Sequence, residues 1–387
     1  MIPKKLPPLP PIRDLIRVYG LSANQKFSQN FILDKNVTDT IAQHAKVSVK
    51  DDLVVEVGPG PGLLTRSILD AGARRVVVVE KDPRFLPTLQ QLAEASDHRL
   101  GILMGDMLKL DHANILKTGS SLHSRPTDVS SAQYSIPTLV GSNDNENTQD
   151  RNLQREQDQY KEDEFWKPMD DRNSTIRLLG NLPFGVASPL LIQWLKMMAL
   201  RQGIFCADNR VSMTLMFQKE VAEGIVAPPS HPQRSRLSVM AQALCNVKMA
   251  YKLPSGVFVP KPKVDAAVVH FEKKAEPLVP GMSVFGNSKE SWTSCRADYL
   301  NVLCYGLIGS LEKLEDVARF YFNKRRKTMG HNTNRMAKAA PEVKPILDEW
   351  VAEGGWDMNM RSQDVSTEQF CALARKLDRA QVKIPLT

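Results

Sequence analysis

The chain has 387 residues, of which 42% are hydrophobic, and it contains no apolar run close to the roughly 18 residues of a membrane helix. Its length allows two domains with substantial cores. The formal net charge is +8, but residues 142–172 hold ten acids and five bases, a net of −5, which leaves +13 on the remainder. A basic excess of this size is typical of proteins with polyanionic partners.

The five cysteines argue against a disulfide framework and against a structural zinc site. They are scattered, odd in number and without C-x-x-C spacing: Cys206, Cys245, Cys295, Cys304 and Cys371. This usage predicts reduced thiols in a protein that is not secreted, and we expect no bound metal.

Residues 1–24 form an N-terminal segment whose composition weakly indicates a mitochondrial address. The stretch Ile12–Leu21 is amphipathic, Asp14 is the only acid before Asp34, and the basic residues are Lys4, Lys5, Arg13 and Arg17. Basic, acid-poor amphipathic segments are typical of transit peptides, although the proline-rich residues 7–11 are not.

The clearest unit of the chain is a strand, a glycine-rich turn, a helix and a second strand. Leu53–Val57 predicts a buried strand, Gly58–Gly62 reads G-P-G-P-G, and Leu63–Ala71 predicts a helix. The second strand, Arg75–Val79, has four consecutive valines, as expected where both faces of a sheet are covered. It ends at Glu80, 22 residues after the first glycine, which is close to the spacing of a carboxylate that binds a ribose. This pattern predicts a nucleotide-binding βαβ unit.

The spacing of the glycines distinguishes between nucleoside cofactors. Dinucleotide sites use G-x-G-x-x-G and place a pyrophosphate at the helix N-terminus. Here prolines stiffen a turn that does not need to hold phosphate, which favours S-adenosylmethionine over NAD, with a purely structural turn as the alternative. A third strand, Leu100–Met104, ends in Gly105-Asp106-Met107, and an acid at this place can accept a hydrogen bond from the cofactor's adenine.

The tetrapeptide Asn181-Leu182-Pro183-Phe184 follows the short apolar strand Ile176–Leu179 and Gly180. Ser188-Pro189 predicts the start of a helix over Leu190–Leu200, so the tetrapeptide lies in a strand-to-helix turn, where open α/β sheets bind ligands. An Asn amide oxygen, a backbone carbonyl held by proline and a Phe ring suit a planar group with an amine, such as adenine. An ordinary turn remains the alternative.

The middle of the chain divides into an insertion and a second group of strands. Residues 118–172 are polar and without periodicity, which predicts a disordered surface insertion. Beyond the tetrapeptide we expect a strand over Val211–Phe217 and helices over Gln218–Ile225 and Leu237–Cys245. The last strands, Val247–Lys252 and Ala267–Phe271, are expected to pair antiparallel at the edge of the sheet.

The loop between the last two strands contains Pro260 and Pro262, which favour an extended backbone. It is expected to present Phe258, Lys261 and Lys263 as an aromatic and cationic clamp for an unstacked base and its phosphates. A rigid connection without a binding role is the alternative.

The last part of the chain, residues 275–387, predicts a linker and a smaller helical domain. We expect a polar linker over Ala275–Ser294 and helices over Leu300–Leu311, Leu314–Asn323 and Ala340–Val351. Residues 319–338 contain seven Lys or Arg and no acid, centred on Lys324-Arg325-Arg326-Lys327. Such a run is either a solvated face or a contact to RNA phosphates, and the basic chain favours the second interpretation.

Taken together, these motifs resemble the ribosomal RNA adenine dimethyltransferase family, and the N-terminus, Arg234–Gln242 and Lys324–Lys327 look specifically like its mitochondrial branch. Outside residues 118–172 and 280–311 the resemblance covers nearly the whole chain. Six ordered motifs carry it: Lys26-Phe27-Ser28-Gln29-Asn30-Phe31, Glu56–Gly62, Val79-Glu80, Gly105-Asp106, Asn181–Phe184 and Phe258–Pro262.

The resemblance implies a Rossmann-like, S-adenosylmethionine-dependent methyltransferase domain over residues 25–274, with a smaller all-helical RNA-binding domain behind it. It implies that Asn30 and Ile32 close over the cofactor and that Gly58 and Gly60 contact its methionine end. The other implied contacts are Glu80 with Lys81 at the ribose, Asp106 and Met107 at the cofactor's adenine, and Asn181 between cofactor and target base. Phe184 stands where many members have Tyr.

The family also implies a reaction and a partner. The substrate would be two adjacent adenines near the 3′ end of small-subunit ribosomal RNA, each methylated twice. The reaction would take place in the mitochondrial matrix and support ribosome assembly. We expect a monomer. The alternatives are a transcription or ribosome-assembly factor without activity on the same scaffold, and a DNA adenine methyltransferase. The intact glycines, acids and tetrapeptide favour an enzyme.

Overall fold

The computed structural model describes residues 6, 14, 17, 30–122, 174–206, 209–275, 277–278, 311–354 and 357–384. Most of the N-terminal segment 1–24, the expected insertion from residue 123 onward, most of the linker and most of the expected helix Leu300–Leu311 lie outside these residues. Within the described part, no helix is both long enough and apolar enough to cross a membrane.

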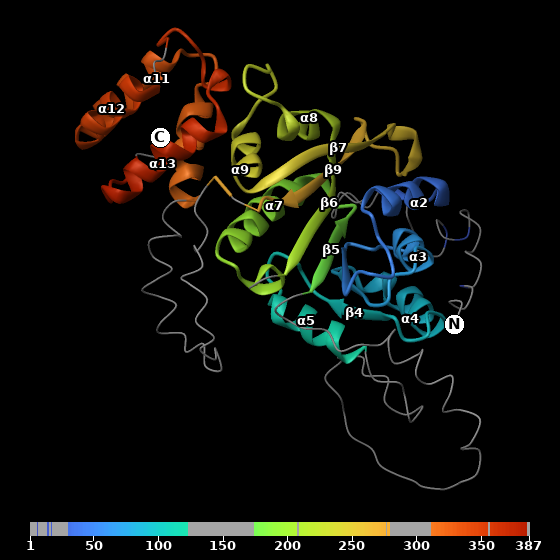
Figure 1. The fold of residues 1–387 in the computed structure, drawn as a ribbon. Coiled ribbons are helices and arrows are strands. Elements are labelled where there is room, and N and C mark those ends of the chain that lie inside the picture. The colour runs from blue at the N-terminus through green and yellow to red at the C-terminus, as the bar shows by residue number, and fades with distance from the viewer. Residues whose placement is uncertain are drawn as a thin grey trace, which may run out of the picture.

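A seven-stranded sheet of order β4-β3-β2-β5-β6-β9-β7 forms the centre of the first domain (Figure 1). The strands from β4 to β6 are parallel, and β9 pairs antiparallel with both β6 and β7. The order reverses between β2 and β5, which is the kind of place where doubly wound sheets bind ligands. The strands of the sheet are β2 (Leu53–Val57), β3 (Val76–Glu80), β4 (Leu100–Met104), β5 (Thr175–Gly180), β6 (Arg210–Gln218), β7 (Cys245–Leu253) and β9 (Ala266–Lys273). A separate two-stranded ribbon pairs β1 (Phe31–Ile32) with β8 (Phe258–Val259).

Both faces of the parallel strands are buried, and successive residues belong to different cores. In β3, Val76 and Val78 pack in a cluster with residues of α2, α3 and α4, whereas Val77 and Val79 pack in a second cluster with residues of α5, α7 and α9. The first domain therefore has helices on both sides of its sheet: α2 (Lys35–His44), α3 (Leu63–Asp70), α4 (Leu86–Ala95), α5 (His112–Ser121), α7 (Phe184–Ala199), α8 (Lys219–Val226) and α9 (Arg236–Leu244).

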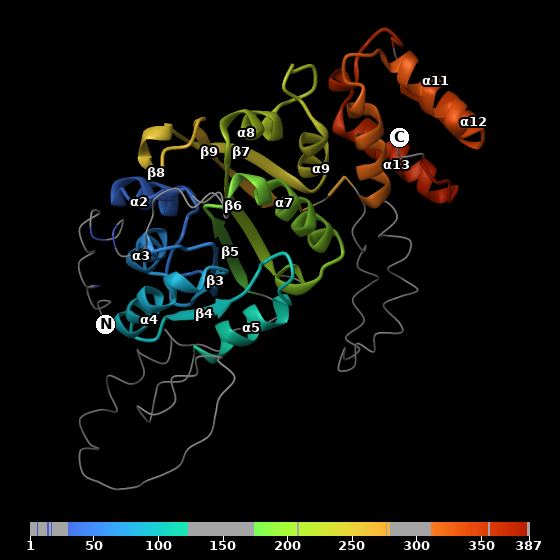
Figure 2. The ribbon, with the colours of Figure 1, turned by 180° about the vertical axis from the view of Figure 1, so that it is seen from behind.

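The C-terminal region is helical, as predicted, and packs against the first domain through α9. Residues 311–323 are helical, and α11, α12 and α13 follow. Both Figure 1 and Figure 2 show these helices beside α9, at the opposite end of the molecule from α2, α3 and α4. The second hydrophobic cluster continues from the sheet into this region, so the two domains share one core. The bounds are α11 (Met329–Ala339), α12 (Lys344–Gly354) and α13 (Thr367–Arg379).

Some expected boundaries are wrong. The helix after the tetrapeptide begins at Phe184, not after Ser188, because the Pro183 carbonyl accepts the first helical bonds from Val186 and Ala187. Pro189 lies inside the helix, where the bond it cannot make would reach the carbonyl of Gly185, an exposed residue that water can solvate.

Two further boundaries differ, and four helices are new. The expected insertion cannot start at residue 118, because α5 continues to Ser121 with Asp111 as its N-cap. The expected helix Ala340–Val351 is replaced by a 3₁₀ turn over Pro341–Val343 and then α12. Helices α4, α5, α11 and α13 are not expected from the sequence; α13 has a capping box between Ser366 and Gln369.

Candidate active site at the carboxyl ends of the central strands

The site lies where β2 and β5 end side by side. Val57 pairs with Gly180, and this register places the glycine turn after β2 next to the tetrapeptide after β5. A Cβ atom on Gly58 would lie 3.9 Å from the Asn181 carbonyl oxygen. The two motifs that the sequence singled out therefore form one wall, although they are more than 120 residues apart.

The glycine turn needs glycine for its backbone conformation and for a close contact. Gly58, Gly60 and Gly62 have φ of +70°, +55° and +83°, in the left-handed region that other residues rarely adopt. At Gly60 a Cβ atom would lie 2.8 Å from the ring of Phe31, so a side chain there would displace β1. The turn is shaped to let β1 lie directly over it.

Glu80 fixes this turn from the end of β3. Its Oε2 accepts a hydrogen bond from the N–H of Gly60 at 3.0 Å, and its Oε1 accepts from the N–H of Lys81 at 2.8 Å and of Asp82 at 2.7 Å. The side chain is 1% exposed, and burial raises the pKa of Glu80, although the three N–H donors lower it in part. A carboxylate has about four lone-pair directions, so one on Oε2 is left for a ligand hydroxyl.

The next predicted site residues, Lys81, Asp106 and Met107, lie just after the ends of β3 and β4. The Lys81 ammonium forms an ion pair of 2.9 Å with Oδ2 of Asp106, whose Oδ1 accepts a hydrogen bond from the N–H of Leu108 at 3.1 Å. The hydrogen bond from Lys81 is the main reason why the pKa of Asp106 lies below its ordinary value. Met107 is 4% exposed and contributes an apolar wall.

These residues surround a cavity of about 230 Å³. Of the nine predicted cofactor-binding residues, eight line it, namely Asn30, Ile32, Gly58, Glu80, Lys81, Asp106, Met107 and Asn181. Gly60 is not part of the lining and acts through its N–H bond to Glu80. Further residues line the cavity that are not predicted to bind the cofactor, including Phe31, Thr38, Glu56 and Leu108.

Glu56 is the most informative of the missed residues. It is 1% exposed, and its Oε2 accepts a hydrogen bond from the Thr65 hydroxyl at 2.6 Å. Burial, with a smaller contribution from the charge on Glu80, raises the pKa of Glu56 to about 8. A carboxyl so close to the point of ionisation gains from a positively charged ligand in the cavity. A single acid within an otherwise apolar strand is the sequence signal that could have identified it.

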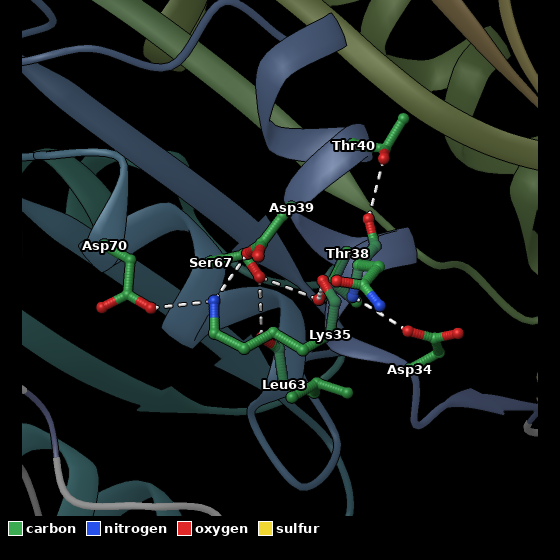
Figure 3. Close-up of polar contacts among 9 residues, drawn as sticks. Asp34, Lys35, Thr38, Asp39, Thr40, Leu63, Ser67 and Asp70 are labelled. Atoms are coloured by element: carbon green, nitrogen blue, oxygen red, sulfur yellow. Dashed lines mark hydrogen bonds and ion pairs between the residues drawn. The ribbon is translucent and has the colours of Figure 1, made fainter.

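Strand β1 closes the cavity from the side of α2. Asp34 caps α2 by accepting from the N–H of Asn36 at 2.9 Å, which fixes where the chain turns after β1. Figure 3 shows how α2 is held on α3: the hydroxyls of Thr38 and Ser67 are 2.8 Å apart and buried. At the surface, Lys35 pairs with Asp39 of its own helix at 2.7 Å and with Asp70 of α3 at 3.0 Å.

The first three residues of the tetrapeptide, Asn181, Leu182 and Pro183, form the remaining wall, and Phe184 is not part of the lining. Asn181 and Pro183 are half-buried, and Leu182 is 2% exposed. The amide Nδ2 of Asn181 donates to the main-chain carbonyl of Asn30 at 2.8 Å. Phe184, the first residue of α7, is half-buried and packs against the α2 side of the sheet.

The loop before β9 differs from its prediction at one residue. Phe258 is 2% exposed, because it pairs with Ile32 in the β1–β8 ribbon and packs into the core beneath it. The expectation that the loop presents this ring to a base is wrong. Lys261 and Lys263 are exposed beyond the ribbon, as expected. A two-residue strand is too short to be recognised by periodicity.

The basic residues Lys324, Arg325, Arg326 and Lys327 are all exposed, in the turn between the helix over 311–323 and α11. The Arg325 guanidinium also donates to the carbonyl of Pro232 in the first domain. The described residues contain no cluster of three or more side chains suited to hold a metal ion.

Comparison with known proteins identifies the family. A sequence model of the ribosomal RNA adenine dimethylase family matches residues 20–301, more than half of the chain. The chain belongs to this family. The predicted fold class is therefore confirmed for this dimethylase, as are its enzyme class and its cofactor class, S-adenosylmethionine.

The dimethylase is similar over long stretches to curated proteins that share one name, dimethyladenosine transferase 1, mitochondrial. The Xenopus tropicalis protein is 41% identical over 277 residues, and the human protein is 40% identical over 275; each alignment covers 71% of this chain and 66% of the relative. The Vermamoeba vermiformis protein is 34% identical over 400 residues, which is 96% of this chain and 95% of the relative. The chain thus spans about two thirds of the length of the frog and human relatives.

Solved structures agree on the fold. A dimethyladenosine transferase from Plasmodium falciparum superposes with a TM-score of 0.53 at 17% identity, covering 91% of this chain and 98% of that one. The 23S rRNA methyltransferase ErmE gives a TM-score of 0.50 at 20% identity, covering 90% and 100%.

The cavity of the dimethylase fits an adenosyl cofactor. The remaining lone pair of Glu80 can accept from a ribose hydroxyl, the Asp106 carboxylate can accept from an adenine amine, and Met107 offers an apolar surface to a ring. A positive charge on the ligand would lower the raised pKa of the buried Glu56 carboxyl and favour its ionised form.

Proposed function

We propose that this dimethylase methylates the exocyclic amines of two adjacent adenines in the 3′-terminal hairpin of mitochondrial small-subunit ribosomal RNA, each of them twice. It would act in the mitochondrial matrix, as a monomer, and support assembly of the small subunit. The observation that carries the proposal is the corner formed by Asn181, Leu182 and Pro183 in the lining of the cofactor cavity, with Phe184 next in the chain. The names of the relatives support the location and the substrate class.

The chemical problem at this corner is that the adenine amine is a poor nucleophile, because its lone pair is delocalised into the ring. The side-chain oxygen of Asn181 and the carbonyl of Leu182 are the acceptors for the two amine hydrogens. Accepting both hydrogens favours a pyramidal nitrogen with its lone pair directed into the cavity. S-adenosylmethionine, when bound, supplies a methyl group on a positively charged sulfur. The chain itself contributes by positioning the adenine amine against the methyl group, and no catalytic carboxylate is needed.

The target base must leave its stack to reach the corner, at a cost of a few kcal/mol. With Phe258 buried, the half-buried ring of Phe184 is the aromatic surface that we assign to stacking of the base. One aromatic contact contributes about 1–3 kcal/mol per base, so it offsets much of the unstacking cost. Pro183 restricts the backbone between the two acceptors, on Asn181 and Leu182, and the ring of Phe184.

Two exposed basic groups are suited to bind the RNA around the base. Lys261 and Lys263 extend from the loop beside the cavity, and the turn at Lys324–Lys327 projects from the helical domain. Each contact to a phosphate increases the affinity for RNA, and this increase becomes smaller as the salt concentration rises. Such contacts do not depend on the RNA sequence.

The decisive experiment compares Asn181→Ala with the wild type on the purified hairpin RNA. We expect the rate of methyl transfer to fall by about 100-fold or more, because an acceptor that acts in the transition state is lost, while cofactor binding by calorimetry survives. Asn246→Ala, on the exposed edge strand β7, is the matched control with an unchanged rate.

An unchanged rate in Asn181→Ala would refute the assignment of the site. The substrate is tested in cells by primer extension across the 3′-terminal hairpin of the mitochondrial small-subunit RNA after depletion of the protein. Loss of the methylation stops supports the proposal. Stops that persist would favour the other function, a transcription or assembly factor without activity.

A further inference from the structure

The catalytic amide makes a contact with a segment far away in the sequence. Nδ2 of Asn181 donates to the main-chain carbonyl oxygen of Asn30, 151 residues earlier, at 2.8 Å. A carbonyl oxygen can only accept, so this contact determines which end of the amide faces β1. The NH₂ group points to Asn30, and the oxygen Oδ1 therefore points away from it.

This orientation matters because an Asn amide has nearly the same shape in both orientations. With the groups exchanged, the NH₂ group would face the amine of a bound adenine, and two sets of donor hydrogens would oppose each other. The contact to Asn30 makes the exchanged orientation unfavourable, because it would place Oδ1 against a carbonyl oxygen.

The Asn30 carbonyl is held in place through the two residues that follow it. The next two residues, Phe31 and Ile32, pair with Val259 and Phe258 in the β1–β8 ribbon. The ring of Phe31 packs edge-on against Phe85, with 5.3 Å between ring centres, and covers the bare backbone of Gly60. Ile32 is 5% exposed. The acceptor is thus part of a packed structure.

We propose that Asn30, through its main-chain carbonyl, is the positioning residue that orients the Asn181 amide for catalysis, and that the β1–β8 ribbon holds it in place. This inference rests on the proposed function of Asn181. It gives β1 a second task besides closing the cofactor cavity. It also connects the basic loop that carries Lys261 and Lys263 to the catalytic corner, because β8 lies at the start of that loop.

The variant Asn181→Asp shows whether catalysis needs only a hydrogen-bond acceptor at this position or also the orientation that Asn30 imposes on it. An aspartate keeps an acceptor for the amine but has no hydrogen for Asn30, so one of its oxygens opposes the carbonyl. If an acceptor alone were sufficient, this variant would be nearly as active as the wild type. If orientation by Asn30 is needed, it is inactive while ionised. Protonation at low pH restores a donor for Asn30 and leaves one carbonyl oxygen as acceptor.

The experiment measures methyl transfer at saturating cofactor from about pH 5.5 to about pH 8.5 for the wild type, Asn181→Asp and Asn181→Ala. Other groups near the corner also titrate or carry charge, namely Glu56, Glu80, Lys81, Asp106, Lys261 and Lys263, so the readout is the ratio of each variant to the wild type at the same pH. We expect the Asn181→Asp ratio to be about 100-fold below one at high pH and to rise as the pH falls, by up to about tenfold per unit. The Asn181→Ala ratio stays low and flat.

A second measurement tests the ribbon through a double-mutant cycle. Phe31→Ala loosens β1 and is expected to lower kcat by about tenfold in the wild-type background, but to have little further effect in the Asn181→Ala background. Thermal melting and cofactor titration show whether each variant is folded. Equal loss in both backgrounds would overturn the inference.

The outcomes also distinguish this inference from the proposed function. Full activity of Asn181→Ala would end the proposed function, and the inference with it. An inactive Asn181→Ala together with an active Asn181→Asp would overturn only the inference, as would an Asn181→Asp ratio that does not change with pH.

Discussion

The cofactor cavity and the junction between the two domains both bury ionic side chains, but they hold them in different ways. In the cavity, the Glu80 carboxylate accepts from the backbone N–H groups of Gly60, Lys81 and Asp82, all within 20 residues of it. At the junction, side chains meet across more than a hundred residues. The Glu80 network is therefore local in sequence, whereas the junction depends on contacts between distant parts of the chain.

Arg234 is the centre of that junction. It is fully buried, and its guanidinium donates to the Ala227 carbonyl at 3.0 Å, to the Gln242 side chain at 3.0 Å and to the Thr367 hydroxyl of α13 at 2.8 Å. None of these partners is charged, and burial lowers the pKa of Arg234 to about 10, so it remains protonated at neutral pH. From this difference we expect cavity variants to impair ligand binding and junction variants to impair cohesion of the domains.

The largest effect is expected for Glu80→Ala. It leaves two buried N–H groups, of Gly60 and Asp82, and the part-buried N–H of Lys81 without their acceptor, which we expect to lower the free energy of unfolding by about 4 kcal/mol in total. Binding of S-adenosylmethionine should be lost as well, because the turn that carries Gly60 is released. Urea denaturation and calorimetric titration measure the two effects.

Glu94→Ala, on the exposed side of α4, is the matched control for this change. It should alter neither quantity by more than about 0.5 kcal/mol. If Glu80→Ala bound the cofactor as tightly as the control, the cavity would not depend on its local network.

The same difference explains what the sequence could predict. Strand Leu53–Val57 and strand Leu100–Met104 have the predicted bounds, and Glu80 lies at the predicted end of its strand, because apolar runs and glycines act locally. Eight of nine predicted cofactor residues line one cavity. The glycine turn and the acids at the strand ends follow from local patterns, whereas Asn30, Ile32 and Lys81 are implied by the resemblance to the family.

What the sequence could not show depends on distant partners. The burial of Phe258 requires β1, the orientation of Asn181 requires Asn30, and Arg234 requires Thr367 of α13. The periodicity and residue spacing within one segment of the chain do not indicate which distant segment it will contact. The late start predicted for α7 has a different cause, since Ser188-Pro189 is a valid helix start that the bonds to the Pro183 carbonyl override.

A smaller effect than that of Glu80→Ala is expected for Arg234→Met. The methionine fills most of the volume but leaves the Ala227 carbonyl, the Gln242 side chain and the Thr367 hydroxyl without their donor, at a cost of about 3 kcal/mol. Limited proteolysis should then release the helical domain sooner, while cofactor affinity is unchanged. Denaturation curves, proteolysis and calorimetry provide the three measurements.

Arg210→Met, at the exposed start of β6, is the control for the loss of an arginine. A wild-type cleavage rate in Arg234→Met would show that the shared hydrophobic core alone holds the two domains together. Weakened cofactor binding in this variant would contradict the independence of the two regions.

The smallest effect is expected for Glu315→Gln, and it depends on pH. The Glu315 side chain is 8% exposed and pairs with Lys196 of α7 at 2.9 Å, with Arg319 at 2.7 Å and with Arg236 of α9 at 3.6 Å. Burial alone would raise the pKa of Glu315, but the hydrogen bonds from Lys196 and Arg319 outweigh it, and the pKa lies below its ordinary value of 4.5.

A carboxyl whose folded pKa is lowered stabilises the protein above its unfolded pKa, and this contribution is lost as the pH falls through the folded value. Glu315→Gln should therefore cost about 1–2 kcal/mol at pH 7, and the difference from the wild type should shrink as the pH drops below 4.5. Glu312→Gln, an exposed residue on the same helix, should show no such difference. If the cost of Glu315→Gln were the same at pH 4 as at pH 7, packing of the side chain, and not its charge, would be what joins α7 and α9 to the helical domain.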